Sequence, residues 1–151
     1  MSLTVALESP LQPEVAELLC LSDAIALRLY PGEPRRALNP QALDVPGTHL
    51  LLARWEGVAA GCCALMEAPD NTAELKRMVV DPAYRNRGVG KGLLLCAEAL
   101  ARGRGISLIR LEVGIRNAAG EALYRREGYR DCAPFGGYRV TPISRFLGKS
   151  L

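Results

Sequence analysis

The stretch Glu74–Lys91, ELKRMVVDPAYRNRGVGK, combines a strand, its end and a glycine-rich loop. Apolar and β-branched residues fill its first half. Asp81 and Pro82 then end the strand, because proline cannot donate to a β-ladder. A loop from Arg85 to Gly90 follows, and an apolar helical pattern starts at once. Backbone N–H groups at a helix N-terminus attract anions, and glycines let the backbone approach closely, so the stretch predicts a phosphate-binding loop.

Two widespread phosphate-binding loops do not fit this stretch. A P-loop requires a glycine five positions before its Gly-Lys pair and a Ser or Thr after it, but Arg85 and Gly92 occupy these positions. A dinucleotide-binding fingerprint requires a third glycine where the chain has Leu93, although Glu112 follows roughly 20 residues later, as that fingerprint demands. The pattern that remains is Arg-x-x-Gly-x-Gly. The purely structural alternative is a tight strand–helix turn with solvated arginines.

Arg85, Gly88 and Gly90 after a strand resemble the acyl-CoA pyrophosphate loop of the GCN5-related N-acetyltransferase (GNAT) superfamily. A second block, Asn117–Tyr129 (NAAGEALYRREGY), is similar to the helix and strand that complete the cofactor site in that family. Together the blocks cover about residues 73–131. The ending, PFGGY and then SRFLGKSL, also resembles a group of small bacterial members. The N-terminal half fits only in its pattern of elements.

The resemblance implies one GNAT-type domain over residues 1–151 that moves an acetyl group from acetyl-CoA to a primary amine of a small molecule or peptide. The residue pattern by itself, a strand meander followed by β–α–β–α–β, predicts one α/β domain. The family adds a mixed central sheet of about six or seven strands, flanked by about four helices. A chain of 151 residues with 49% hydrophobic residues has the size and core for one domain.

The residue pattern predicts strands and helices along the whole chain. Strands are predicted at 3–7, 49–54, 58–67, 73–80, 106–113, from 129 and at 143–147. Helices are predicted from Pro13 to Tyr30, as one helix or as two with Ser22 and Asp23 capping the second, from Val89 until Gly103 and Gly105, and from Asn117 through Glu127. Residues 35–47 are expected to be irregular. Adjacent Cys62 and Cys63 should point to opposite faces of their strand.

Composition excludes several classes of protein. No apolar run approaches the ~20 residues of a membrane span, and no basic segment followed by an apolar stretch opens the chain, so we expect neither a membrane nor export. The five Cys lack paired CxxC spacing and the chain has one His, so we expect no metal site. The thiols are expected to be reduced, in the cytoplasm. The net charge of +3 gives little support to nucleic-acid binding. Between residues 85 and 105, five basic residues and one acid favour a phosphate-bearing cofactor.

The resemblance assigns the pyrophosphate to the glycine loop. The implied cofactor-binding residues there are Arg85, Asn86, Arg87, Gly88, Val89, Gly90 and Lys91. The thioester carbonyl oxygen gains negative charge during transfer and needs a donor already in place. In the family a backbone N–H of a bulged strand supplies it, which here lies near Met78, Val79 and Val80. Val80 is the preferred cofactor-facing strand end.

Two side chains are implied to handle protons. Tyr124 holds the acid position of the family, and an ordinary pKa of about 10 keeps it protonated at neutral pH, so it can donate to the leaving thiolate. It could also bind the sulfur without proton transfer, or pack as an aromatic residue between helix and sheet. Glu74 stands 14 residues before Gly88, which matches the catalytic glutamate of some histone-type members. A polar strand residue or an ion pair is an equal alternative for Glu74.

Three further polar residues have structural alternatives. Asn117 can cap the following helix, and the family residue at this place often bonds the cofactor; both can hold. Glu112 is a second carboxylate candidate, for which a salt bridge on the strand face is favoured. His49 is expected to be structural rather than a general base.

The acceptor side is expected in the variable region before residue 47, where the weak candidates are Tyr30, Arg35, Arg36 and Asn39. A solvated loop is the favoured interpretation for each of them. Two other classes of protein remain open: a non-catalytic acyl-CoA-binding or regulatory module, and a nucleotide-binding redox domain that Leu93 disfavours. Small members of the family often form dimers, for which the final strand is the expected interface.

Overall fold

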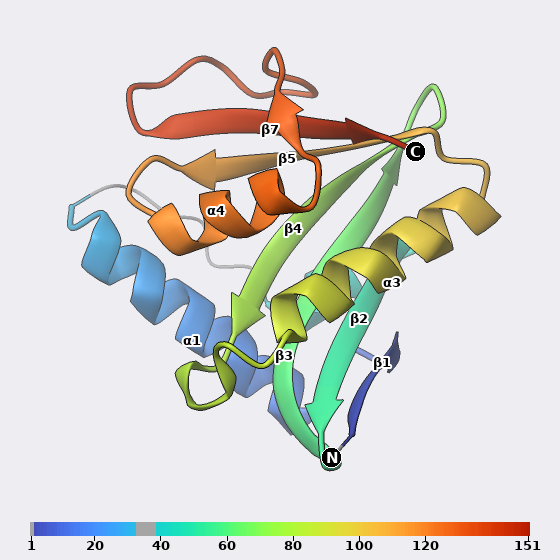
Figure 1. Cartoon of the computed structure of the whole chain (residues 1–151), viewed down its shortest axis with the longest axis vertical. Helices are drawn as coiled ribbons and strands as arrows, with labels where there is room; N and C mark the ends of the chain where they lie inside the picture. Colours follow the sequence, from blue (N-terminus) through green and yellow to red (C-terminus); the bar gives the residue numbers. More distant parts are fainter. Residues whose placement is uncertain (1, 33–38) are drawn as a thin grey trace.

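The computed structural model of the chain describes residues 2–32 and 39–151. These residues form one α/β layer structure built on a seven-stranded sheet with the order β1-β2-β3-β4-β5-β7-β6 (Figure 1). The strands are β1 Leu3–Leu7, β2 Thr48–Trp55, β3 Val58–Ala68, β4 Thr72–Val80, β5 Leu108–Gly114, β6 Arg130–Asp131 and β7 Ser144–Ser150. The sheet is mixed, because β4 and β5 pair in parallel and the other neighbouring strands pair antiparallel.

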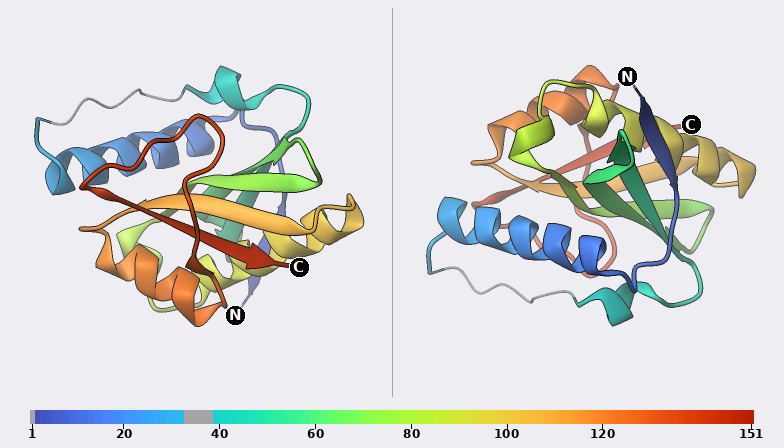
Figure 2. Two further views of the ribbon diagram at one scale, coloured as in Figure 1. Left: turned by 90° about the horizontal axis from the view of Figure 1, so that it is seen from above. Right: turned by 90° about the horizontal axis from the view of Figure 1, so that it is seen from below.

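Helices cover both faces of the sheet. Within the described ranges they are α1 Pro13–Leu29, α2 Pro40–Leu43, α3 Val89–Gly103 and α4 Ala118–Arg126, with a 3-10 turn at Pro82–Tyr84. Figure 2 shows α1 on one face and α3 and α4 on the other. Burial follows this arrangement: Leu93 and Leu94 of α3 pack with Leu51 and Leu65, whereas Val15 and Leu18 of α1 pack in a second cluster. The predicted α/β class, mixed sheet and strand order along the chain are confirmed.

Cys62 and Cys63 illustrate the two-sided core. Cys62 packs in the cluster under α1, and Cys63 packs in the cluster under α3. Both side chains are fully buried, because alternate residues of a strand point to opposite faces and helices cover both faces here. The predicted opposite orientation of these cysteines is confirmed.

Helix α1 corrects one expectation. It runs unbroken from Pro13 to Leu29, so the alternative of a second helix capped by Ser22 and Asp23 is wrong. Its buried residues lie in the first half, whereas Leu27 near its end is 65% exposed. The core therefore buries mainly the first half of the helix, and Ile25 of the second half is partly buried against the same cluster.

Smaller corrections concern element ends. The region expected to be irregular contains α2, whose first turn Asn39 caps by accepting from Ala42 N at 2.9 Å. Leu95 of α3 is 49% exposed, although its neighbours Leu93 and Leu94 are fully buried. The last strand continues to Ser150, and the strand after Tyr129 pairs only at Arg130 and Asp131. No helix in the described residues is long and apolar enough to cross a membrane.

Candidate active site

A bulge in β4 shapes the centre of the sheet. Cys62 pairs with Val79 and Ala64 with Lys76, so two residues, Arg77 and Met78, lie opposite Cys63 alone. Arg77 has a φ of 57°, a backbone conformation that residues other than glycine rarely adopt. The extra residue changes which side chains face which side of the sheet.

The change of face is visible in the packing. Before the bulge, Leu75 belongs to the cluster under α3 and α4. After it, Val79 belongs to the cluster under α1, while Met78 and Val80 pack toward α3 and α4. The bulge therefore turns the end of β4 relative to its beginning.

After Glu74, near the beginning of β4, the two parallel strands β4 and β5 separate. Their pairing covers only Thr72–Glu74 against Leu108–Arg110, although both strands continue. Asp81 N donates to Ala60 O at 2.8 Å, so alternation along the strand points the N–H of Val80 away from β3 and toward the opening. The separated strands thus form an opening lined by backbone donors of β4, which is the arrangement that a developing oxyanion needs.

The glycine loop lies beside this opening and is built by positive φ angles. Asn86 has a φ of 62° and Gly88 a φ of 78°, and Gly88 caps α3 without a side-chain hydrogen bond. Gly92 N donates to Gly88 O at 2.9 Å, so the N–H groups of Val89, Gly90 and Lys91 precede the first intrahelical bond and have no intrahelical acceptor. This geometry fits an anion at the N-terminus of α3.

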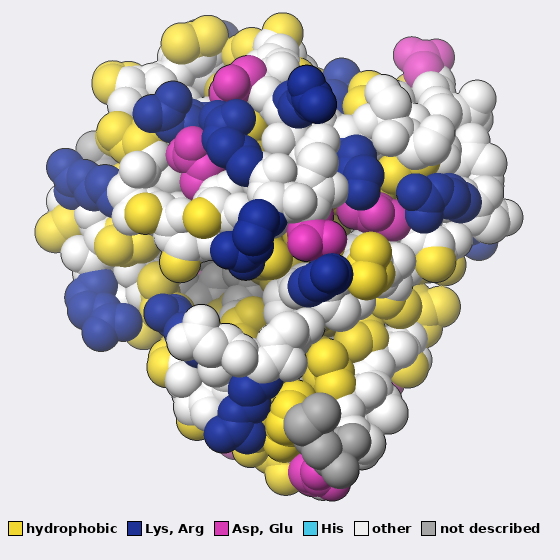
Figure 3. All heavy atoms as spheres, in the orientation of Figure 1, with side chains coloured by type: hydrophobic (Ala, Val, Ile, Leu, Met, Phe, Trp, Pro, Cys, Tyr) yellow, Lys and Arg dark blue, Asp and Glu magenta, His cyan; other side chains and the backbone are white. Residues whose placement is uncertain are grey.

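Basic side chains surround the loop. The Arg87 guanidinium lies over the rings of Trp55 and Tyr84, at 5.1 and 5.5 Å from their centroids. Arg85 and Lys91 are exposed and form no ion pair with the residues that the structure describes. Figure 3 shows Lys and Arg side chains gathered on this face, around a hollow next to α4.

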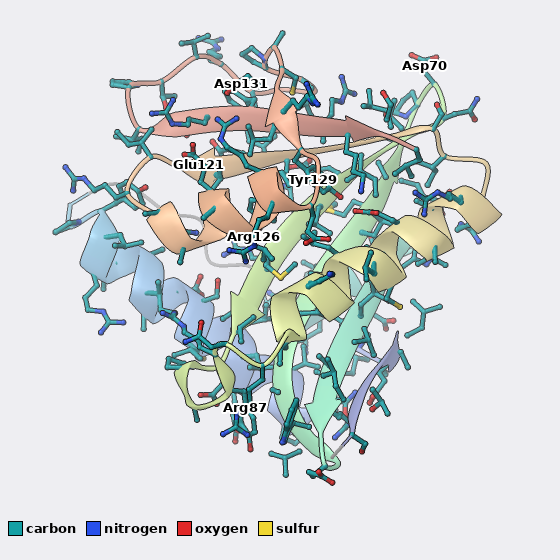
Figure 4. All side chains as sticks on the ribbon, in the orientation of Figure 1. Asp70, Arg87, Glu121, Arg126, Tyr129 and Asp131 are labelled. Carbon is teal, nitrogen blue, oxygen red and sulfur yellow. The ribbon has the colours of Figure 1, made fainter. Side chains whose placement is uncertain are left out.

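Helix α4 approaches the loop closely at Gly90, where an added Cβ would come within 2.7 Å of Leu123 Cδ2. Arg126 extends from α4 on the same face as Arg87 of the loop (Figure 4). It is exposed, and the sequence analysis did not select it. Its place on the helix two residues after Tyr124 did not distinguish it from an ordinary solvated arginine.

Tyr124 lies in α4 with only 6% of its surface exposed, and it packs in the core cluster beneath α3 and α4. Its ring meets Tyr129 edge to face, with centroids 6.0 Å apart. Its hydroxyl makes no hydrogen bond with the described part of the chain. Burial raises the pKa of the Tyr124 phenol above its ordinary value, and Cys63, opposite the bulge, raises it further. Tyr124 is therefore protonated at neutral pH and has a proton to donate.

Glu74 points to the other face, because its neighbours Ala73 and Leu75 are in the cluster that contains Tyr124. Tyr138 Oη donates to Glu74 Oε2 at 2.5 Å, and Lys76 Nζ is 3.9 Å from the same oxygen. Burial raises the pKa of the Glu74 carboxyl; Tyr138 and Lys76 lower it and only partly offset the burial. The raised pKa makes Glu74 a stronger proton acceptor than an ordinary exposed glutamate.

The remaining predicted residues have identifiable partners. Asn117 Oδ1 accepts from Gly120 N at 3.0 Å, so it is the helix cap. Glu112 accepts from Ser144 Oγ at 2.7 Å, rather than forming the expected salt bridge. His49 Nε2 is 2.7 Å from Glu67 Oε2, a partner that supports the structural interpretation.

Two of the weak acceptor candidates serve structure. Tyr30 Oη accepts from Arg116 N at 2.8 Å and holds the end of α1 to the segment after β5. Asn39 caps α2, whereas Arg35 and Arg36 lie outside the described residues. In the ranges 2–32 and 39–151, no group of three or more His, Cys, Asp or Glu side chains could hold a metal ion.

The chain resembles known proteins in sequence and in fold. The model of the Acetyltransferase (GNAT) family matches residues 15–129. An IAA acetyltransferase from Azospirillum brasilense is 39% identical over 99% of each chain. The uncharacterised N-acetyltransferase YedL from Escherichia coli is 34% identical, over 98% of this chain and 94% of its own.

Solved structures agree with these sequence relatives. A presumed acyl-CoA N-acyltransferase from Klebsiella pneumoniae has a TM-score of 0.84 and 33% identity, over 99% of this chain and 97% of its own. The PaiA N-acetyltransferase from Thermoplasma acidophilum, solved in complex with coenzyme A, shares the fold with a TM-score of 0.75 and 22% identity, over 100% of each chain.

Proposed function

Because this chain belongs to the acetyltransferase (GNAT) family and is an acyl-CoA-dependent N-acetyltransferase, we propose how its own residues carry the transfer. We propose that the acetyl group of acetyl-CoA passes directly to a primary amine of a small molecule or peptide. The opening between β4 and β5 is the place of transfer, with the cofactor on the side of α3 and α4 and the amine on the side of Glu74. The observation that carries this proposal is the end of β4–β5 pairing at Glu74 and Arg110, after which β4 continues unpaired with β5 to Val80 and leads into the glycine loop.

The glycine loop fits a pyrophosphate. Its αL glycine and the free N–H groups of Val89, Gly90 and Lys91 provide donors that converge on one side, and Arg85, Arg87 and Lys91 add positive charge. Asn86 lies within the same turn. Asn117 caps α4, and its remaining hydrogen-bonding capacity is available to the cofactor.

The cofactor supplies an activated acyl group, and the chain supplies hydrogen bonds and proton transfer. The N–H groups at the end of β4, at Met78 and Val80, donate to the carbonyl oxygen as it gains charge, and Val79 fixes that strand end by packing under α1. Tyr124 holds a proton for the departing sulfur. Its raised pKa makes it a weaker acid than an exposed tyrosine, but one that a thiolate partner in a dry site can use.

Glu74 takes the proton from the incoming ammonium. A raised pKa makes its carboxylate a better base than an ordinary exposed glutamate, provided that the solution pH keeps it ionised. Glu112, the second carboxylate candidate, lies on β5, where it accepts from Ser144. We assign Glu112 to the wall of the acceptor side rather than to proton transfer.

The first test is isothermal titration with acetyl-CoA, CoA and NAD. We expect acetyl-CoA and CoA to bind and NAD not to bind, since the dinucleotide fingerprint is incomplete. Acetyl-CoA binding without thiol release from any amine of a broad panel would favour a non-catalytic acyl-CoA module instead. NAD binding in preference to CoA would overturn the assignment of the loop.

We also propose a cytoplasmic location and, with the final strand as its expected place, a homodimer. Five free cysteines, two of them fully buried, are consistent with a reducing compartment. Gel filtration with light scattering measures the oligomeric state directly.

A further inference from the structure

The loop between β6 and β7 brings the PFGGY motif onto the face that carries Glu74. In Figure 2 this red segment leaves the side of α4, passes the sheet edge and extends toward α1 before β7 begins. Phe135, Tyr138 and Phe146 pack together there, with ring centroids 5.2 to 6.0 Å apart. The cluster anchors the loop, because Phe135 and Phe146 are both buried.

Within this cluster, Tyr138 contacts the proposed base directly. Its hydroxyl donates to Glu74 Oε2 at 2.5 Å. Burial and the Glu74 carboxylate both raise the pKa of the Tyr138 phenol, so the phenol keeps its proton and acts as the donor. The other carboxylate oxygen, Oε1, makes no hydrogen bond with a described residue.

We propose that Tyr138 is the positioning residue of the acceptor site: it holds one oxygen of Glu74 so that the other faces the incoming amine. The inference rests on the proposed role of Glu74 as the base. A carboxylate on a strand has rotational freedom about its side-chain bonds, and a short charge-assisted hydrogen bond removes that freedom. A base oriented before the substrate arrives transfers the proton with less reorganisation.

The charged and titratable groups around Glu74 come from three elements. Lys76 lies on β4, Arg110 and Glu112 lie on β5, and Tyr138 comes from the loop. The Asp23–Arg77 ion pair, with Nη1 and Oδ1 at 3.0 Å, joins α1 to the bulge, and the Arg77 charge lowers the pKa of the Tyr138 phenol.

The same loop also contacts Arg110, whose positive charge favours the ionised form of Glu74. Its guanidinium lies 4.8 Å from the Phe135 ring centroid, and its buried Nε has no hydrogen-bond partner. It forms no ion pair with any carboxylate in the described ranges, so its charge acts on Glu74 at a distance. Phe135 therefore contacts the Arg110 cation, and Tyr138 supplies a hydrogen-bond donor, both beside the carboxylate of Glu74.

The sign of the effect follows from these contacts. The Tyr138 hydrogen bond lowers the pKa of Glu74, against the larger effect of burial. Removing the hydroxyl should therefore raise that pKa further, so that the base becomes ionised only at higher pH. A purely structural tyrosine would not move the pH profile in this direction.

The experiment compares kcat/KM against pH for the wild type, Tyr138→Phe and Val140→Ala. Tyr138→Phe keeps the ring and its packing, and Val140, in the same loop, is 81% exposed and serves as the matched control. We expect Tyr138→Phe to move the acidic limb to higher pH and to reduce kcat/KM at neutral pH by about tenfold, the size of one hydrogen bond to a charged group. Acetyl-CoA affinity should be unchanged, and Val140→Ala should match the wild type.

Glu74→Gln separates the two levels of the proposal. If Glu74→Gln keeps wild-type turnover, the base assignment fails and the role of Tyr138 fails with it. If Glu74→Gln is inactive but Tyr138→Phe gives the wild-type pH profile, Tyr138 is a packing residue and only this inference is overturned. Unchanged melting temperature and CoA affinity in Tyr138→Phe establish that its fold is intact.

Discussion

Glu74 on β4 and Tyr124 on α4 lie on opposite faces of the central sheet, beside the point where β4 and β5 separate. A closed pair of strands would keep a proton acceptor on one face apart from a proton donor on the other. The separation after Glu74 and Arg110 removes that barrier, and the bulge at Arg77 turns the end of β4 toward the opening. We therefore propose that the two side chains serve one reaction site across the sheet.

Replacing Tyr124 with Phe should lower turnover far more than it lowers CoA affinity. The phenylalanine ring keeps the packing in the core, whereas the hydroxyl that we propose as donor to the leaving thiolate is lost. General acids contribute about 100-fold or more, so we expect kcat to fall by that factor. Turnover from thiol release and affinity from calorimetry measure the two effects. Equal losses of both would instead make the hydroxyl a binding or folding group.

Replacing Gly88 with Val should abolish CoA binding. No atom lies within 4 Å of the position that a Cβ would take, so the effect comes from the φ of 78° rather than from a clash. A left-handed residue other than glycine costs about 1–2 kcal/mol, and β-branched residues cost more, so the loop would rearrange.

Gly103→Ala is the control for Gly88→Val, because Gly103 lies at the end of the same helix with open space and no positive φ. Calorimetry should show wild-type CoA affinity for this variant. Wild-type affinity in Gly88→Val as well would contradict the assignment of the loop.

Glu74→Gln should remove activity and leave the fold as stable as the wild type, or more stable, at pH 7. The folded-state pKa of Glu74 is raised, so native protein binds this proton more tightly than unfolded chain does. The contribution of Glu74 to stability is therefore present at low pH and is lost as pH rises through the folded pKa. A neutral glutamine avoids that loss.

Melting temperatures from pH 4 to pH 8 test the sign of this effect. The difference between Glu74→Gln and the wild type should be largest at the high end of the range and should shrink as the pH falls. A variant that is less stable than the wild type at every pH would show that ionised Glu74 contributes to the fold.

Replacing Glu98 with Leu should destabilise the fold without changing the active site. Glu98 is 1% exposed, accepts from Tyr129 Oη at 3.1 Å and pairs with Lys149 Nζ at 2.9 Å. Removing Glu98 leaves the Lys149 ammonium without its ion-pair partner, which costs about 3 kcal/mol, the low end for a broken buried pair because Lys149 is partly exposed. Urea unfolding measures the loss.

Glu98→Leu combined with Lys149→Met is the matched variant. It removes both charges, so it should recover most of the lost stability. No recovery in the double variant would mean that Glu98 acts mainly through Tyr129.

The predictable parts of the site are local in the chain. The glycine loop, the cap at Asn117 and the opposite orientation of Cys62 and Cys63 depend on residues within a few positions of one another. The Tyr138–Glu74 hydrogen bond spans 64 positions, and the motif around Tyr138 pointed only to a resemblance. The bulge was expected near Met78 from that resemblance, but nothing in Arg77 itself indicates a positive φ.

Residue types and their spacing were enough to predict the α/β class and a phosphate-binding loop, whereas the acid candidate Tyr124 was implied by the resemblance to the family. Backbone conformation, helix capping and strand alternation are short-range effects, and a single stretch such as Glu74–Lys91 contains all of them. Tertiary packing decided three further features. It kept α1 unbroken, separated β4 from β5 after Glu74, and brought Tyr138 to Glu74. These contacts join segments far apart in the chain, and their energies depend on burial and on partners from other elements.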